Sequence, residues 1–190
     1  MDKSHDRELP VRPGQPNAVS PSYQEVLNFD TFVPDYLRAE SAPFLGDEPV
    51  DTSCFTSHEF FEKEVEKLWP RIWQYACREE EVPNVGDYVV YDIARYSLLI
   101  TRTAEDKIQA FHNVCLHRGR KLCLENGHAQ RFRCPFHGFT WGVNGEFRGT
   151  PANWDFSSLT KEDYKLPEAK VEVWAGYVFI NMDDNAPPLH

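Results

Sequence analysis

The chain has 190 residues and a formal net charge of −10, and 41% of its residues are hydrophobic. This length allows one domain and part of another, and the acidic charge argues against nucleic acid or an anionic membrane surface as a partner. No apolar run reaches the roughly 18 residues of a membrane-spanning helix. Residues 1–16 lack the apolar core of a signal peptide, and five cysteines do not suit a disulfide framework. We therefore expect a cytoplasmic protein.

Composition and the spacing of apolar residues divide the chain into three parts. Residues 1–50 hold seven of the 14 prolines and show little periodicity, so we assign residues 1–54 to an irregular N-terminal arm. Residues 55–84 are assigned to an amphipathic helix and a linker. From about Gly86 the apolar period changes to two, and residues 85–190 are assigned to a β-domain.

The expected helix begins with a recognisable start signal. Thr56 and Glu59 match a capping box, and Phe55 is placed to contact Phe60 as a hydrophobic staple. An apolar face follows at helical spacing, made of Phe61, Val65, Leu68 and Ile72. Pro70 predicts that the helix ends or kinks just before it.

The β-domain is expected to consist of short antiparallel strands. Two-residue turns are predicted at Asn144-Gly145, a strong hairpin signal, and at Ala175-Gly176. The predicted strands are 87–93, 96–102, 107–111, 139–143, 146–148, 170–174 and 177–182. This pattern predicts a mainly β fold with a small antiparallel β-domain.

Two stretches at expected strand ends each pair one cysteine with one histidine. Cys115 and His117 form the first pair, and Cys134 and His137 the second. Thiolate and imidazole bind zinc, copper and iron–sulfur clusters, but a structural zinc usually takes like ligands from each knuckle. One sulfur and one nitrogen per loop favour a [2Fe–2S] cluster of the Rieske kind, in which one iron has two cysteines and the other two histidines. A zinc site, and ordinary core or surface residues, are the alternatives.

Other residues near these pairs receive a different interpretation. Gly119 and Gly138 follow the two histidines and would let the backbone approach the cluster. Trp141 is expected either to cover the cluster or to be an ordinary core residue. The remaining cysteines lack a partner at ligand spacing and are expected to be small buried residues; they are Cys54, Cys77 and Cys123.

The motifs resemble those of a known family. The stretches A-F-H-N-V-C-L-H-R-G (110–119) and F-R-C-P-F-H-G-F-T-W (132–141), with G-D-Y-V-V-Y (86–91), are similar to the N-terminal half of the α subunit of Rieske non-haem iron aromatic ring-hydroxylating oxygenases. Respiratory-chain Rieske proteins carry an extra cysteine in each loop, where this chain has Arg120 and Phe136. They also tend to have a serine at the position of Phe139. The oxygenase branch is therefore the better match.

The resemblance implies a fold, a cofactor and partners. It implies a Rieske-type antiparallel β-domain with two cluster-binding hairpin loops, in which Cys115, His117, Cys134 and His137 hold the cluster. A reductase or ferredoxin would supply electrons, and the cluster would pass them to a mononuclear Fe(II) that hydroxylates an aromatic substrate with O2. Such subunits form homotrimers or α/β oligomers.

The second iron site is expected outside these residues. In the family it lies in a catalytic domain with a His-x4-His motif; the one such spacing in the 190 residues, from His112 to His117, uses the histidine of the first Cys/His pair and leaves none for a second iron. We therefore expect the catalytic domain to be absent and this chain alone not to be catalytically competent. A stand-alone Rieske ferredoxin-like electron carrier is the alternative function.

Overall fold

A computed structural model describes residues 23–38, 49–156 and 158–190. The chain divides into two compact units, Met1–Val50 and Asp51–His190. The first contains the short helix α1 (Tyr23–Leu27) and the 3-10 helix η1 (Asp35–Leu37); much of the predicted arm lies outside the described residues. The helices of the second unit are α2 (Ser53–Thr56), α3 (His58–Lys67), η2 (Glu79–Glu81) and η3 (Asn153–Phe156). Within the described ranges, no helix is long and apolar enough to cross a bilayer.

Helix α3 begins at a different residue from the one that the sequence pattern indicates. Ser57 is its N-cap, with its hydroxyl accepting a hydrogen bond from the Phe60 backbone N–H at 3.3 Å. Thr56 instead ends α2, where its hydroxyl donates to the Thr52 carbonyl, so the predicted capping box is wrong. Phe55 is 81% exposed, which leaves the predicted staple without burial.

The apolar face of α3 is shorter than predicted. The helix stops at Lys67, before Pro70 as expected, and Leu68 is its C-cap. Val65 is the buried residue of α3, and its carbonyl accepts a hydrogen bond from the Tyr96 hydroxyl at 3.4 Å. The helix is therefore attached to the β-domain through Val65 and through an ion pair between Glu62 and Arg95, whereas Phe61 and Leu68 remain 42% and 38% exposed.

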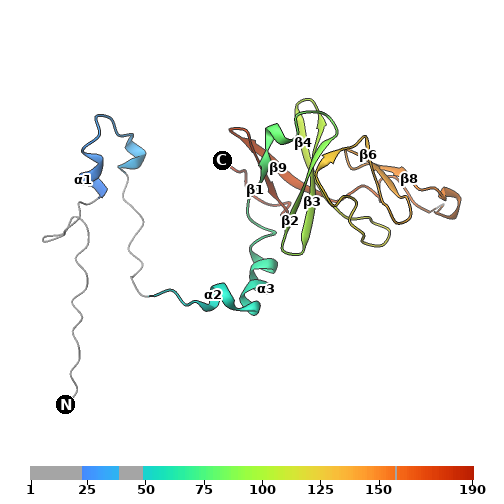
Figure 1. The fold of residues 1–190 in the computed structure, drawn as a ribbon, viewed down its shortest axis with the longest axis horizontal. Coiled ribbons are helices and arrows are strands. Elements are labelled where there is room, and N and C mark those ends of the chain that lie inside the picture. Colours follow the sequence, from blue (N-terminus) through green and yellow to red (C-terminus); the bar gives the residue numbers. More distant parts are fainter. Residues whose placement is uncertain (1–22, 39–48, 157) are drawn as a thin grey trace, which may run out of the picture. The chain divides into compact units, whose positions relative to one another are not determined.

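The larger sheet of the second unit has seven antiparallel strands in the order β1-β10-β9-β4-β3-β2-β5 (Figure 1). Its strands are β1 (Gln74–Arg78), β2 (Asp87–Ile93), β3 (Tyr96–Ala104), β4 (Lys107–His112), β5 (Gly127–His128), β9 (Glu168–Trp174) and β10 (Tyr177–Asn181). The turn at Ala175-Gly176 joins β9 to β10 with both residues at positive φ, 50° and 82°. Such backbone angles are those of a tight hairpin turn.

A smaller three-stranded sheet lies beside the larger one (Figure 1). It is formed by β6 (Arg131–Arg133), β7 (Thr140–Gly142) and β8 (Phe147–Gly149), in that order. Asn144-Gly145 makes the β7–β8 turn as predicted, and Gly145 has a φ of 75°. A Cβ at Gly145 would lie 2.5 Å from the Phe111 ring of β4. The tip of this hairpin therefore packs directly on the larger sheet, at a position that only glycine fits.

The mainly β antiparallel prediction is confirmed, and the structure adds three strands. Strand β1 falls within residues 55–84, which the sequence assigned to a helix and linker, and it pairs with β10. Strands β5 and β6 contain two and three residues, too few to show a period. The core around the small sheet is largely aromatic; its fully buried members include Phe111, Phe132, Phe139 and Trp141.

Candidate metal centre

The two Cys/His pairs lie on two loops that come from different sheets. The first loop leaves β4 and reaches β5, and the second joins the neighbouring strands β6 and β7. Both pairs therefore begin at strand ends, as the sequence indicated. The imidazole rings of His117 and His137 lie 4.8 Å apart between centroids, so the structure brings the two loops together.

The backbone of the two loops follows the same hydrogen-bonding pattern. In the first, the Cys115 N–H donates to the Arg120 carbonyl at 2.7 Å, and the Gly119 N–H donates to the Cys115 carbonyl at 2.8 Å. In the second, the Cys134 N–H donates to the Phe139 carbonyl at 2.8 Å, and the Gly138 N–H donates to the Cys134 carbonyl at 3.0 Å. Each loop is thus closed over the same number of residues, although the histidine stands at a different place within it.

The glycine of each loop supplies the backbone angle that closes it. Gly119 and Gly138 have φ values of 72° and 76°, a left-handed conformation that other residues adopt at a cost. A Cβ at Gly138 would also lie 2.8 Å from the Pro151 ring, whereas nothing lies within 4 Å at Gly119. The glycines are therefore required first for loop closure, and at Gly138 also for packing.

The sulfurs are buried, whereas the imidazoles lie at the surface. Cys115 and Cys134 are each 2% exposed, while His117 is half-buried and His137 is exposed. The Phe139 ring stacks on the His117 ring, with 4.6 Å between ring centroids and an interplanar angle of 12°. The ring centroids of Phe136 and His137 are 3.8 Å apart. A phenylalanine ring therefore packs against each imidazole.

Burial and neighbouring groups shift the pKa values of one thiol and one imidazole of the site. Burial raises the pKa of the Cys115 thiol, and the adjacent Cys134 thiol raises it further, while the backbone N–H groups of His117 and Arg118 act in the opposite direction. Burial, followed by the charges of His137 and Arg118, lowers the pKa of His117. A histidine that is neutral at physiological pH can offer a ring nitrogen lone pair to a metal.

One atom of the site has no partner of its own. The His117 Nδ1 is fully buried and makes no hydrogen bond with any of the described residues. A buried polar atom without a partner is costly, and such an atom in a native fold calls for an explanation. Coordination of a metal by Nδ1 would satisfy it, so the residues present fit an iron–sulfur cluster.

The donor set suits two metal ions better than one. In the described part of the chain, no group of three or more His, Cys, Asp or Glu side chains is arranged to hold a single ion. A structural zinc needs four such ligands around one centre. A Rieske cluster needs only two protein ligands at each iron, because sulfides supply the rest.

Asn113 is a positioning residue that the sequence did not single out. It is 2% exposed, and its Oδ1 accepts hydrogen bonds from the backbone N–H groups of Leu122 and Cys123 at 2.9 and 3.0 Å. Its Nδ2 donates to the Cys123 carbonyl at 2.7 Å and to the Ser97 hydroxyl at 3.0 Å. This side chain joins the start of the first loop to its far side.

Replacing Asn113 with alanine is expected to lower the free energy of unfolding by about 3 kcal/mol, since two backbone N–H groups and one carbonyl lose their partner. Urea unfolding followed by tryptophan fluorescence measures the change. Asn185→Ala is the matched control, because Asn185 is exposed; it should change the free energy by less than about 0.5 kcal/mol. Equal losses in the two variants would contradict the role of Asn113.

Of the remaining residues singled out in the sequence, Trp141 and one cysteine lie in the core. Trp141 is fully buried and its indole N–H donates to the Tyr164 carbonyl at 2.7 Å, which makes it a core residue; the ring that faces His117 is Phe139. Of the other cysteines, Cys77 is buried as predicted, at 1% exposed, whereas Cys54 and Cys123 are half-buried, so the prediction of burial is wrong for these two.

Comparison with known proteins gives the family of this domain. Residues 72–161 match the Rieske [2Fe-2S] domain. The chain is 31% identical over 144 residues to the α subunit of 2-aminobenzenesulfonate 2,3-dioxygenase from Alcaligenes sp, covering 74% of the chain and 36% of that protein. It is 31% identical over 158 residues to the oxygenase subunit of glycine betaine monooxygenase from Pseudomonas aeruginosa, covering 82% and 35%.

Solved structures agree with the sequence comparisons. The crystal structure of naphthalene 1,2-dioxygenase from Rhodococcus sp. bound to indole superposes with a TM-score of 0.65 at 32% identity, covering 69% of the chain and 31% of that structure. The chain spans about a third of the length of these relatives. Residues 72–161 are therefore a Rieske [2Fe–2S] domain, and the chain is similar to about a third of the length of oxygenase subunits that contain such a domain.

Proposed function

We propose that Cys115 and Cys134 bind one iron of the [2Fe–2S] cluster and that His117 and His137 bind the other. The convergence of the two loops carries this assignment, because it places two buried sulfurs behind two imidazoles near the surface. The unpartnered Nδ1 of His117 supports it. When bound, the cluster supplies storage for one electron at a time.

The chain's own residues determine how this electron enters and leaves. The cysteines lie in the aromatic core, which excludes water from the sulfur side. The exposed imidazole of His137 offers the shortest path between the site and a partner. Phe139 stacks on His117 and has no hydroxyl to donate toward the cluster, and fewer donors to sulfur mean a lower reduction potential.

The whole subunit is proposed to be an oxygenase. A reductase or ferredoxin would deliver electrons to this domain, and a mononuclear Fe(II) in a catalytic domain beyond the 190 residues would use them to hydroxylate an aromatic or related apolar substrate with O2. The relatives' names include both dioxygenases and monooxygenases, and either outcome is compatible with the proposal. The full-length protein would assemble as a homotrimer or an α/β oligomer, and the 190 residues alone would accept electrons without hydroxylating a substrate.

The purified chain should contain two irons and two acid-labile sulfides, as a Rieske centre does. After reduction, its electron paramagnetic resonance spectrum should have an average g value below that of all-cysteine clusters, because histidine nitrogen binds the ferrous iron. The reduction potential should lie near about −150 mV, at the lower end of the Rieske range. Stoichiometric zinc without sulfide would refute the cluster, and a potential above roughly +100 mV would refute the oxygenase branch.

A further inference from the structure

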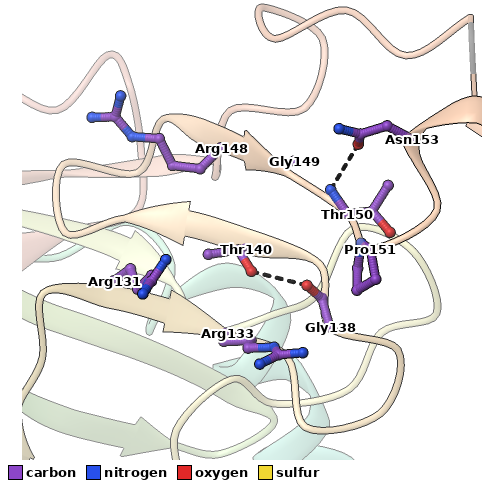
Figure 2. Close-up of a pocket in the computed structure, with 9 residues that line it drawn as sticks. All are labelled: Arg131, Arg133, Gly138, Thr140, Arg148, Gly149, Thr150, Pro151 and Asn153. Atoms are coloured by element: carbon purple, nitrogen blue, oxygen red, sulfur yellow. Dashed lines mark hydrogen bonds between the residues drawn. The ribbon is translucent and has the colours of Figure 1, made fainter.

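The small sheet that carries the second loop has one apolar face and one basic face. Its inward side chains are buried; they are Phe132, Trp141 and Phe147. Because side chains alternate along a strand, their neighbours point outward. The outward residues include an arginine pair on β6, Thr140 on β7 and Arg148 on β8 (Figure 2). The arginine pair consists of Arg131 and Arg133.

The middle strand leaves room between the arginines. A Cβ at Gly142 would lie 3.0 Å from the Arg148 Nε, so the guanidinium of Arg148 lies over the space that a side chain at this position would occupy. A Cβ at Gly138 would lie 3.3 Å from an Arg133 guanidinium nitrogen, which places that charge beside the residue following His137. The result is a groove of about 330 Å³ lined by all three arginines and ending at the second loop. We call it the arginine groove.

Among the described residues, one of the three arginines of the arginine groove has an acidic partner. Of its lining residues among those described, none is acidic, and neither the Arg131 nor the Arg133 side chain has a hydrogen-bond or ion-pair partner in the described ranges. Arg148 pairs with Glu146 at 3.1 Å, but both side chains are more than half exposed, where such a pair is weak. Although the chain has a net charge of −10, three arginine side chains thus lie together beside the second loop.

The three guanidinium groups of the groove favour an anionic ligand. Guanidinium groups bind carboxylates through paired hydrogen bonds, and they can bind a small free anion in the same way. Three guanidinium groups spread over two outer strands fit several carboxylates at the surface of another protein better than one small ion. Charges of opposite sign also raise the rate at which two proteins meet. We propose that the arginine groove docks an acidic electron-donor protein beside the second loop, a proposal that rests on the proposed function above.

The electron balance of this step is simple. One electron leaves the reduced donor and converts one iron of the Rieske cluster from ferric to ferrous, with no bond made or broken in the donor. A plant-type ferredoxin has a lower reduction potential than a Rieske centre, so transfer runs toward this chain. A plant-type ferredoxin with a net negative charge is therefore a suitable probe.

Stopped-flow spectroscopy of the iron-loaded chain tests the proposal. Reduced plant-type ferredoxin is one electron donor, and the methyl viologen radical, a small cation, is the other. In the Arg131→Gln/Arg133→Gln variant, the second-order rate with ferredoxin at low ionic strength should fall about tenfold or more, with a weaker dependence on salt. The rate with viologen should not fall. Arg71→Gln, at an exposed arginine outside the groove, should match the unmodified chain with both donors.

The outcomes separate three explanations. Equal ferredoxin rates in the double variant and the unmodified chain, with normal reduction by viologen, would overturn the docking proposal alone. Saturable binding of sulfate that is lost in the double variant, with an unchanged ferredoxin rate, would identify a site for free anions and also overturn docking. A chain that takes up no cluster, or that viologen does not reduce, would overturn the proposed function and the docking proposal together.

Discussion

Cys115→Ala is expected to abolish the cluster, so that the purified protein loses its reddish-brown colour and contains only background iron and sulfide. The two buried sulfurs come one from each loop, and no cysteine lies at ligand spacing to replace either of them. Loss of Cys115 leaves one iron with a single protein ligand and disconnects the first loop from that iron. His137→Ala should have the same result at the other iron. Iron and acid-labile sulfide analysis, together with the visible absorption spectrum, measures both variants.

Cys123→Ala is the matched control for this prediction. Cys123 also lies close to the first loop and is half-buried, but it has no cysteine or histidine partner at ligand spacing. This variant should keep two irons and two sulfides per chain, as a Rieske centre requires. A full complement of iron in Cys115→Ala, or its loss in Cys123→Ala, would refute the ligand assignment.

Trp141→Ala is expected to lower the free energy of unfolding by about 4 kcal/mol, because it removes the largest fully buried side chain and leaves a cavity. The indole packs against Phe139 and Phe147, with ring centroids 6.4 and 5.7 Å away. Its loss also leaves the Tyr164 carbonyl without its donor. Since Phe139 stacks on His117, the cavity should loosen the support of the first imidazole as well. Urea unfolding monitored by circular dichroism measures the stability.

A second tryptophan provides the comparison. Trp154 is 77% exposed, so Trp154→Ala should change the free energy of unfolding by less than about 0.5 kcal/mol. Similar losses in the two variants would show that Trp141 does not anchor the core of the small sheet.

The strands that the sequence predicts well are those with local signals. Strand β2 has the predicted ends, Asp87 and Ile93, because its apolar period and flanking turns are contained in one short stretch. Strand β1 gives no such signal: its sequence Q-Y-A-C-R becomes a strand by pairing with β10, far along the chain. At the start of α3, Thr56 and Ser57 are both good caps, and the choice between them depends on α2, which the local pattern does not reveal.

In the site, too, some features have a local sequence signal and others depend on contacts between distant segments. Ligand type and spacing indicate the four residues proposed to bind the cluster without any knowledge of distance, because a Rieske cluster constrains both. The role of Asn113 depends on contacts across its loop with Ser97, Leu122 and Cys123, and no periodic pattern encodes such contacts. The arginine groove is likewise invisible in the sequence R-F-R until the three-stranded sheet places Arg148 on the same face.

The close contact between Gly145 and Phe111 has a consequence for how the site tolerates change. The first loop belongs to the larger sheet and the second to the smaller one, so the gap between them depends on how the sheets are held against each other. Metal ligands must be placed to within about 0.2 Å, whereas a methyl group at Gly145 would have to push the Phe111 ring or the hairpin away. A chain with all four ligands intact can therefore fail to assemble its cofactor because of one hairpin tip, and a defect in metal loading need not lie among the metal ligands.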